Sequence, residues 1–506
     1  MSFLLASFLA VSLAASGYAN PLSTHPYDVP HERSSLAYAP LLIPHHPYGT
    51  VNNSYIIMLK EGITPALMQN HLNFLATVHE SNPLVDDLDA GLRHVYDGHV
   101  KGYAGKFSED TIVSIRQMPE VEYIERDQIV RTLDMPADEV DINSVKSQKN
   151  APWGLARISH RSRLTFGTFK KYEYDPRGGE GVDVYVVDTG IFINHTEFEG
   201  RASWGATIPQ GDVDEDANGH GTHCAGTIAS RAYGVAKAAN VIAVKVLGSN
   251  GSGSMSDVVA GVAFVAKQAA TKAAAAAKEF AETGKTKHKG SVANMSLGGG
   301  KSRALDETVN KAVDGGVLFA VAAGNDNRDA CTSSPASAEK AVTVGASTLG
   351  DDRAYFSNYG PCVDVFAPGL NVLSTYIGHK DAVTTISGTS MASPHTAGLL
   401  AYLLSIYPSA TFDPTLVPDL TPAVMQEQSF TPSFSRAYEF AHSVLPSWVS
   451  MFLPPPQLVV APIPAPPTTL TPKQLKQALL ALATENVLET LPTGTPNLLI
   501  FNNATA

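Results

Sequence analysis

The chain has 506 residues, of which 44% are apolar and 17% are charged, so it can bury the core of one large domain together with a smaller one. Its formal net charge of -12 argues against nucleic acid and against an anionic membrane surface as partners, because both would need Lys and Arg gathered on one face. The chain contains three cysteines, so at most one disulfide can form within it.

The N-terminus carries an apolar segment from Phe3 to Ala15, followed by small residues and Asn20. This order is typical of a secretory signal peptide, which we assign to residues 1–19. A membrane anchor is the alternative, but the segment is shorter than the roughly 20 residues that span a bilayer, and no later stretch reaches that length. Residues 20–53 are rich in Pro, His and Ser without a period, and we expect a linker there.

Residues 54–131 predict a small α+β domain. Apolar residues alternate in its strand segments and recur at helical spacing between them. The expected elements are strands at 54–60, at 94–107 with a turn, and at 121–130, with helices at 64–80 and 108–118. A unit of this size is only marginally stable alone.

Residues 132–149 form a polar stretch, and beyond it β-branched runs alternate with helices rich in small residues. Expected strands lie at 182–188, 241–247, 291–296, 317–323 and 341–345, and expected helices at 255–278 and 302–313. This alternation is typical of an α/β fold with a mostly parallel sheet and helices on both faces. Active sites in such sheets lie beyond the carboxyl ends of the strands.

The large α/β domain is expected to span residues 150–506 with one interruption. A helix beginning near Ser390 is apolar on nearly all sides, so we expect it to be buried. Residues 408–469 are Pro-rich and aperiodic, and we interpret them as a surface insertion. A helix at 472–484 and a strand at 497–501 then resume the domain.

Three polar side chains stand where these apolar elements begin or end. Asp188 ends a strand, His220 lies in the first turn of a helix, and Ser390 lies at the N-terminus of the buried helix. A serine hydroxyl attacks a carbonyl only with a base in hydrogen-bond reach and a third group that orients the base. These residues supply both, and their order along the chain differs from that of α/β-hydrolases.

A fourth residue, Asn325, follows the strand at 317–323, and its carboxamide can donate a hydrogen bond to an oxyanion. Each signal is weak alone, because an aspartate at a strand end is usually a turn former and a histidine at a helix start usually a cap. Together, in this order, they favour a serine peptidase over a non-catalytic binding protein. An esterase is disfavoured as well, because the segment Gly388 to Ala392 lacks the final glycine of a nucleophile elbow.

Longer segments around these residues resemble the subtilase family. The matching segments are Ala151–His160, Val184–Gly190, Asn218–Gly226, Asn294–Gly299, Ala323–Asn325, Ala354–Gly360, Phe366–Gly369 and Gly388–His395. They are similar to fungal subtilases of the proteinase K subfamily, and most closely to cerevisin-type vacuolar proteases. The resemblance implies a subtilisin-like fold with Asp188, His220 and Ser390 as catalytic triad.

The resemblance also implies a zymogen that acts on proteins and peptides. Residues 54–131 are similar to the inhibitory propeptides of the family, and self-cleavage within 134–149 would release the peptidase. Two strand edges are expected to bind an extended substrate backbone, and small residues to leave an S1 pocket for apolar or aromatic side chains. The expected substrate-binding residues are Gly251, Ser252, Gly253, Ser296, Leu297, Gly298, Ala322, Ala323 and Gly324.

The resemblance further implies a disulfide between Cys331 and Cys362. Cys224 then remains as a thiol one helical turn after His220, a reactive group beneath the imidazole, a small buried apolar residue, or both at once. His220, His223 and Cys224 also suggest zinc, which we disfavour because no separate ligand cluster accompanies them.

No cofactor is required by this chemistry. Asp364 resembles the aspartate that binds calcium in proteinase K, with carbonyls near Glu339 and Ala341 as partners, so calcium is a candidate ligand. Sequons that are acceptors if exposed occur at Asn52, Asn194, Asn250 and Asn503, whereas a fifth, at Asn294, is expected to be buried and bare. We expect a monomer in the secretory pathway, with the vacuole favoured over extracellular release.

Overall fold

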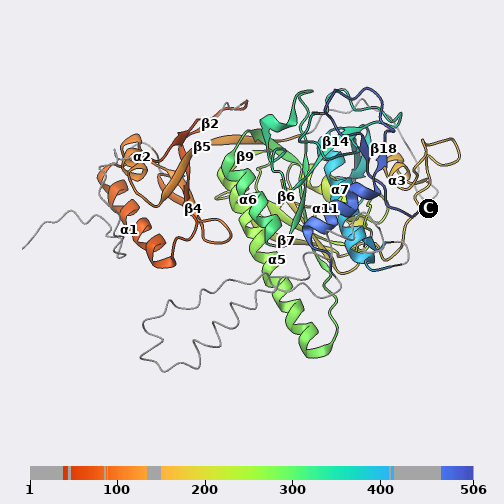
Figure 1. Ribbon diagram of the computed structural model, residues 1–506, viewed down its shortest axis with the longest axis horizontal. Helices are drawn as coiled ribbons and strands as arrows, with labels where there is room; N and C mark the ends of the chain where they lie inside the picture. The colour runs from red at the N-terminus through yellow and green to blue at the C-terminus, as the bar shows by residue number, and fades with distance from the viewer. Residues whose placement is uncertain are drawn as a thin grey trace, which may run out of the picture.

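The computed structural model describes residues 38–43, 47–84, 87, 89–133, 150–409, 412–414 and 469–504. The expected signal peptide, the stretch 134–149 and most of the expected insertion lie outside these residues. In Figure 1 a small unit lies at one end and a larger unit at the other, with α5 (Met255–Thr283) and α6 (Arg303–Asp314) beside the small unit.

The small unit is an α+β domain with two helices, as the sequence predicts, and its sheet of strands β2 to β5 is antiparallel. Its strands are β2 (Thr50–Leu59), β3 (Gly91–Tyr96), β4 (Gly102–Lys106) and β5 (Val121–Thr132), in the order β5-β2-β4-β3. Its helices are α1 (Pro65–Ser81) and α2 (Glu109–Arg116). Thr64 and Ser108 cap them, because each side chain accepts a backbone N–H of the first helical turn.

The strand β2 is apolar on both faces. Tyr55, Ile57 and Leu59 pack in the small unit's own core, whereas Ile56 and Met58 belong to the core that continues into the large unit. Successive side chains of a strand point to opposite faces, so the sheet lies between its own helices and the large unit. The marginal stability of the small unit is therefore supplemented by burial against its neighbour.

The small unit begins earlier than residue 54. The strand β1 (Leu41–Leu42) pairs in parallel with β5, and the N–H of Ala39 donates to the carbonyl of Arg116. The expectation that residues 20–53 are a linker is thus wrong for the described residues from 38 onward. A strand of two residues is too short to show the alternation by which a strand is recognised in sequence.

The large unit is built on a sheet whose strands are parallel except at one edge, which confirms the expected fold class. The order is β18-β19-β15-β14-β12-β10-β6-β8-β7, and only β18 and β19 pair antiparallel. The strands are β6 (Val182–Asp188), β7 (Ala202–Thr207), β8 (Asn240–Lys245), β10 (Gly290–Met295), β12 (Leu318–Ala322), β14 (Val342–Ser347), β15 (Val365–Pro368), β18 (Thr484–Glu485) and β19 (Leu498–Leu499).

Helices cover both faces of this sheet. The helices α4 (His220–Ala229) and α7 (Thr389–Ile406) contact each other, and α5 and α6 contact each other. Every residue of α4 and α7 is buried, and for α7 the apolar sequence predicted this burial. The remaining elements include a short helix, α3 (Trp153–Ile158), and a hairpin of β16 (Val372–Thr375) and β17 (Val383–Ile386).

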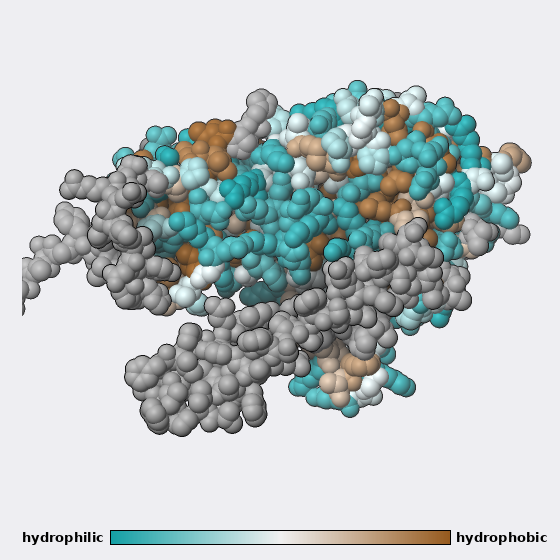
Figure 2. Space-filling model, viewed as in Figure 1, coloured by the Kyte–Doolittle hydropathy of each residue, from teal (hydrophilic) through white to brown (hydrophobic). Residues whose placement is uncertain are grey.

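The helix α5 is long and apolar enough to cross a membrane by length and composition, contrary to the expectation that no stretch after residue 19 would be. Its first half, from Met255 to Ala269, is largely buried, whereas most of the second half is exposed. Figure 2 shows its projecting end as a mixture of hydrophilic and apolar residues. The buried first half packs in the core of the large unit.

Candidate active site

The predicted catalytic residues meet at the carboxyl edge of the parallel sheet. Asp188 is the last residue of β6, and Asn325 lies in the loop after β12. His220 is the first residue of α4 and Ser390 the second of α7, and these two helices pack together. Parallel strands bring their carboxyl ends to one edge, which explains why residues so distant in sequence converge.

Asp188 and His220 form a buried pair. Nδ1 of His220 is 2.7 Å from Oδ1 of Asp188, and Nε2 has no hydrogen-bond partner among the described residues. Burial alone would lower the pKa of His220, but the adjacent charge of Asp188 and its hydrogen bond outweigh burial and raise the pKa well above its usual range. The carboxylate thus favours the imidazolium that forms when Nε2 accepts a proton.

The hydroxyl of Ser390 is not hydrogen-bonded to His220. It donates to the carbonyl of Ser296 at 3.0 Å. The two residues nevertheless adjoin, because Sγ of Cys224 is 4.0 Å from Nδ1 of His220 and 3.4 Å from the carbonyl oxygen of Ser390. Hydrogen bonds between a catalytic hydroxyl and its base commonly form or tighten only when substrate binds.

Asn325 has one end of its carboxamide fixed and the other free. Its Oδ1 accepts the N–H of Thr389 at 2.9 Å and the Thr389 hydroxyl at 2.8 Å. Its Nδ2 is buried with no hydrogen-bond partner in the described part of the chain. The amide group is therefore oriented as a donor beside the N-terminus of α7, whose backbone N–H groups carry partial positive charge.

Asp216 supports the histidine and was not predicted. Its carboxylate accepts the N–H groups of Gly219 and Thr222, at 2.9 Å each, and the hydroxyl of Thr189 at 2.9 Å. These bonds tie the loop before His220 to the turn after Asp188. In the sequence Asp216 is one of several acidic residues in a polar loop, and no pattern distinguishes it from its neighbours.

Asp188, His220 and Cys224 also lie close enough to be considered as metal ligands, since their ligand atoms are within 4.8 Å of one another. His223, however, donates from Nε2 to the carbonyls of Val372 and Thr384 and is not part of this cluster. Burial raises the pKa of the Cys224 thiol, which disfavours the thiolate that metals bind. The grouping is better explained by the hydrogen bond between Asp188 and His220.

The two expected substrate edges enclose a strand of the chain itself. The strand β5 pairs antiparallel with β9 (Ser252–Ser254) on one side and with β11 (Leu297–Gly300) on the other. Arg131 faces Gly298 in this register, and the N–H of Thr132 donates to the carbonyl of Gly251 at 3.0 Å. The end of the small unit therefore lies where an extended peptide was expected.

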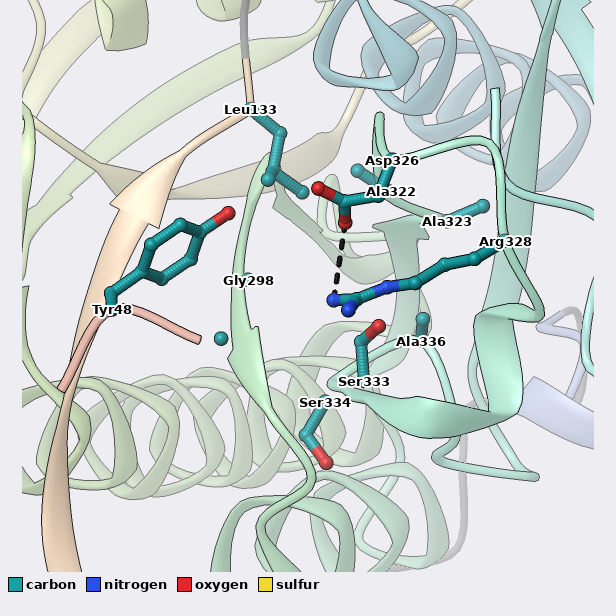
Figure 3. A pocket seen from close by; sticks show the side chains of 12 residues that line it. Tyr48, Leu133, Gly298, Ala322, Ala323, Asp326, Arg328, Ser333, Ser334 and Ala336 are labelled. Atoms are coloured by element: carbon teal, nitrogen blue, oxygen red, sulfur yellow. Dashed lines mark ion pairs between the residues drawn. The ribbon is translucent and has the colours of Figure 1, made fainter. Parts of the chain in front are cut away.

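Leu133 continues this strand into a pocket. Figure 3 shows its side chain directed between Gly298 and Ala322, and it is 8% exposed. Small residues at 298–299 and 322–324 line the pocket, as predicted, together with Tyr48. An ion pair between Asp326 and Arg328, 3.2 Å apart, also lines it. Leu133, Tyr48 and this ion pair were not predicted, because the fold alone brings them together.

Two buried carboxylates of β5 meet helix N-termini of the large unit. Asp127 accepts the N–H of Ser256 at 3.0 Å and its hydroxyl at 2.7 Å, in the first turn of α5. Glu125 accepts the N–H of Ala304 in α6 at 3.2 Å. Their oxygens accept backbone N–H groups that have no partner within the helices, so these contacts join the small unit to the large one.

The disulfide between Cys331 and Cys362 is formed, with a Cα–Cα distance of 5.3 Å, and Cys224 is free and buried.

The expected calcium ligands are found together as well. Asp364 lies beside the carbonyls of Glu339 and Ala341, but the ammonium group of Lys476 stands among their oxygens. The sequence patterns did not predict that Lys476 would lie at this site.

Comparisons with known proteins agree with this geometry. The subtilase family matches residues 179–430, and the peptidase inhibitor I9 family matches residues 54–133. A subtilisin-like protease of Coccidioides posadasii is 50% identical over 92% of this chain and 83% of its own length. Alkaline protease 2 of Aspergillus fumigatus is 48% identical over 89% of this chain and 81% of its own length.

A solved structure is also similar to this chain. The crystal structure of a cold adapted subtilisin-like serine proteinase is 37% identical, with a TM-score of 0.50, and the match covers 70% of this chain and 98% of that one. The chain therefore belongs to the subtilase family and is a subtilisin-like serine peptidase preceded by an I9 propeptide domain.

Proposed function

We propose that the chain is the zymogen of an endopeptidase in which Ser390 is the nucleophile and His220 the general base. Asp188 orients the imidazole and stabilises its charged form, and Asn325 binds the oxyanion. The observation that carries this proposal is the 2.7 Å hydrogen bond between Asp188 and His220, which leaves Nε2 without a partner among the described residues, beside the N-terminus of α7.

In the proposed reaction, the hydroxyl of Ser390 turns from the carbonyl of Ser296 towards His220. Its oxygen attacks the peptide carbonyl carbon while Nε2 takes the proton. Nδ2 of Asn325 and the N–H of Ser390 donate to the oxyanion. The imidazolium then protonates the leaving amine, and water hydrolyses the acyl-enzyme by the same steps.

The first substrate of this site is proposed to be the bond between Leu133 and Asp134. Antiparallel pairing of β5 with β9 and β11 supports this proposal, because Arg131 and Thr132 pair as residues of a bound peptide would, and Leu133 follows them. Leu133 fills the pocket of small residues, as the side chain before a scissile bond would. Cleavage there leaves the propeptide bound as a product, which explains inhibition.

Labelling with a fluorophosphonate tests the catalytic assignment. The processed wild-type enzyme should react and Ser390→Ala should not, and Ser390→Ala should also remain at full length. Labelling of the alanine variant would overturn the role of Ser390.

N-terminal sequencing of the wild-type product tests the site of cleavage, and a mature N-terminus other than Asp134 would overturn that assignment.

A pair of leucines gives a matched control for the cleavage site. Leu133→Asp should slow self-cleavage at least tenfold, because a carboxylate would have to enter a pocket lined by Gly298 and Ala322. Leu92 lies on β3 and is 46% exposed, so Leu92→Asp should leave the rate unchanged. Equal rates in both variants would remove Leu133 from the site.

The pocket also supports a broad specificity. Backbone pairing along β9 and β11 is independent of the substrate's side chains, and the small residues around the pocket accept apolar or aromatic groups. The charges of Asp326 and Arg328 are paired with each other and therefore select weakly for a charged substrate. A peptide library should show enrichment of Leu, Phe or Tyr before the cleaved bond.

Membership of the proteinase K subfamily, and the closer relation to cerevisin-type proteases, remains a proposal, as does a vacuolar destination reached through the secretory pathway. The disulfide supports an oxidising compartment, and the exposed sequons at Asn194 and Asn250 support glycosylation. Cell fractionation tests the vacuolar destination, and glycosidase treatment tests glycosylation. Size-exclusion chromatography tests the proposed monomer.

A further inference from the structure

The ammonium group of Lys476 lies among four oxygens. Its Nζ is 3.0 Å from the carbonyl oxygen of Glu339 and 2.5 Å from that of Ala341. It is also 3.0 Å from each carboxylate oxygen of Asp364. An ammonium group has three N–H donors, and here each of the three residues provides an acceptor for one of them.

These oxygens are the ligands that a hard divalent cation takes. Calcium binds carboxylates and backbone carbonyls at about 2.3–2.6 Å. An ion at that distance from Asp364, Glu339 and Ala341 would occupy the space of the lysine Nζ, and the two cations would repel each other. The residues present therefore fit the ammonium group and do not fit calcium while Lys476 is in place.

The site is rigid on the side of the sheet. Asp364 immediately precedes β15, and its Oδ2 accepts the N–H of Thr343 in β14 at 2.8 Å. Ala341 immediately precedes β14 and is fully buried. The side chains of Lys476 and Asp364 are 17% and 23% exposed, so the pair is partly shielded from water and stronger than an ion pair on the open surface.

The lysine reaches this site from another part of the chain. It lies on α11 (Pro472–Leu482), whose buried residues Leu475 and Leu479 fix the helix against the core. Thr471 and Gln474 form a capping box at its start. The ammonium group is thus placed by the packing of α11, and it ties this C-terminal helix to the sheet strands β14 and β15.

We propose that Lys476 is a built-in cation that takes the place of a divalent metal at this site. The folded peptidase then needs no calcium here to join α11 to the sheet. Removing the ammonium group should expose an oxygen cage that binds calcium.

Thermal unfolding of the full-length Ser390→Ala chain, in which self-digestion is prevented, tests this proposal with EDTA and with excess CaCl₂. Lys476→Ala should lower the melting temperature in EDTA, and calcium should restore several degrees in a saturable way. Isothermal titration should find one more calcium ion bound than in the parent. Adding Asp364→Asn should abolish both effects.

Two further variants complete the test. Lys473 is on the same helix and exposed, so Lys473→Ala should respond to calcium only as the parent does. Lys476→Met keeps the apolar stem and replaces the alanine variant if that one does not fold. The proposal is overturned if the parent binds calcium in a manner that Asp364→Asn removes, or if neither Lys476 variant responds to calcium.

Discussion

Asn325 shows how one side chain is held in an unfavourable state that suits catalysis. Its oxygen accepts two hydrogen bonds from Thr389, while its buried Nδ2 has no partner in the described chain. A buried donor left unpaired costs about 1–3 kcal/mol. In the proposed mechanism that donor is satisfied only when an oxyanion forms, so its hydrogen bond favours the transition state over the ground state.

Replacing Asn325 by alanine should therefore lower kcat with little change in KM. The expected loss is about 10²–10³-fold, which is the loss that removing one such donor causes in subtilisin itself. Steady-state kinetics on a peptide substrate measure the two constants. Asn325→Asp, which keeps the acceptor for Thr389 but replaces the donor with an anion, should be at least as inactive, and a change confined to KM would contradict the assignment.

The strand β5 is the element that links the propeptide domain to two strands of the peptidase. It joins two sheet edges of the peptidase, and its residue Asp127 accepts hydrogen bonds from Ser54 in the propeptide and from Ser256 in α5. The chain therefore holds its inhibitor by backbone pairing and by a buried carboxylate at a helix N-terminus. Truncating one partner of a buried, charged hydrogen bond typically costs about 2–5 kcal/mol.

Asp127→Ala should consequently shorten the interval between self-cleavage and the appearance of peptidase activity, by at least about tenfold. Gel electrophoresis times the cleavage, and hydrolysis of a peptide substrate times the release of the propeptide. Ser256→Ala, which removes one hydroxyl donor from the peptidase side, should have a smaller effect in the same direction. Asp110 is exposed on α2 and serves as the control. If Asp110→Ala shortened the interval as much as Asp127→Ala, the role of Asp127 in holding the propeptide would be contradicted.

For the whole molecule, the contact between propeptide and peptidase makes stability depend on pH. Burial raises the pKa of Glu125 to about 7, from an ordinary value of 4.5, and its hydrogen bond to Ala304 only partly offsets this. The unfolded chain releases this proton above pH 4.5, whereas the folded chain keeps it until about pH 7. Raising the pH through this window therefore favours unfolding, by up to about 3 kcal/mol.

The variant Glu125→Gln should isolate this effect, because glutamine resembles the protonated carboxyl and does not titrate. In the Ser390→Ala background it should melt at the parent's temperature at pH 5 and above it at pH 8. Glu122 pairs with Arg303 at the surface, so Glu122→Gln should show no such divergence. If Glu125→Gln melted at the same temperature as its parent at pH 8, ionisation of the Glu125 carboxyl would not destabilise the folded chain.

Patterns in the sequence predicted the long buried strands and helices and the types of residue in the proposed active site. Strand β6 begins and ends where its apolar run does, at Val182 and Asp188, and α7 begins beside Ser390. Local physics suffices here, because alternation, helical spacing and apolar runs each reflect the faces that must be buried. The disulfide partners and the substrate edges were implied by resemblance and did not follow from periodicity.

Which residues of distant segments meet depends on the three-dimensional fold. Leu133 in the pocket, Asp216 beneath the histidine loop and Lys476 among the oxygens around Asp364 each depend on contacts between segments far apart in the chain. The same holds for Leu41–Leu42, a two-residue strand that exists because β5 offers it an edge. Such contacts leave no local period in the sequence, since the free energy that fixes them comes from packing between elements.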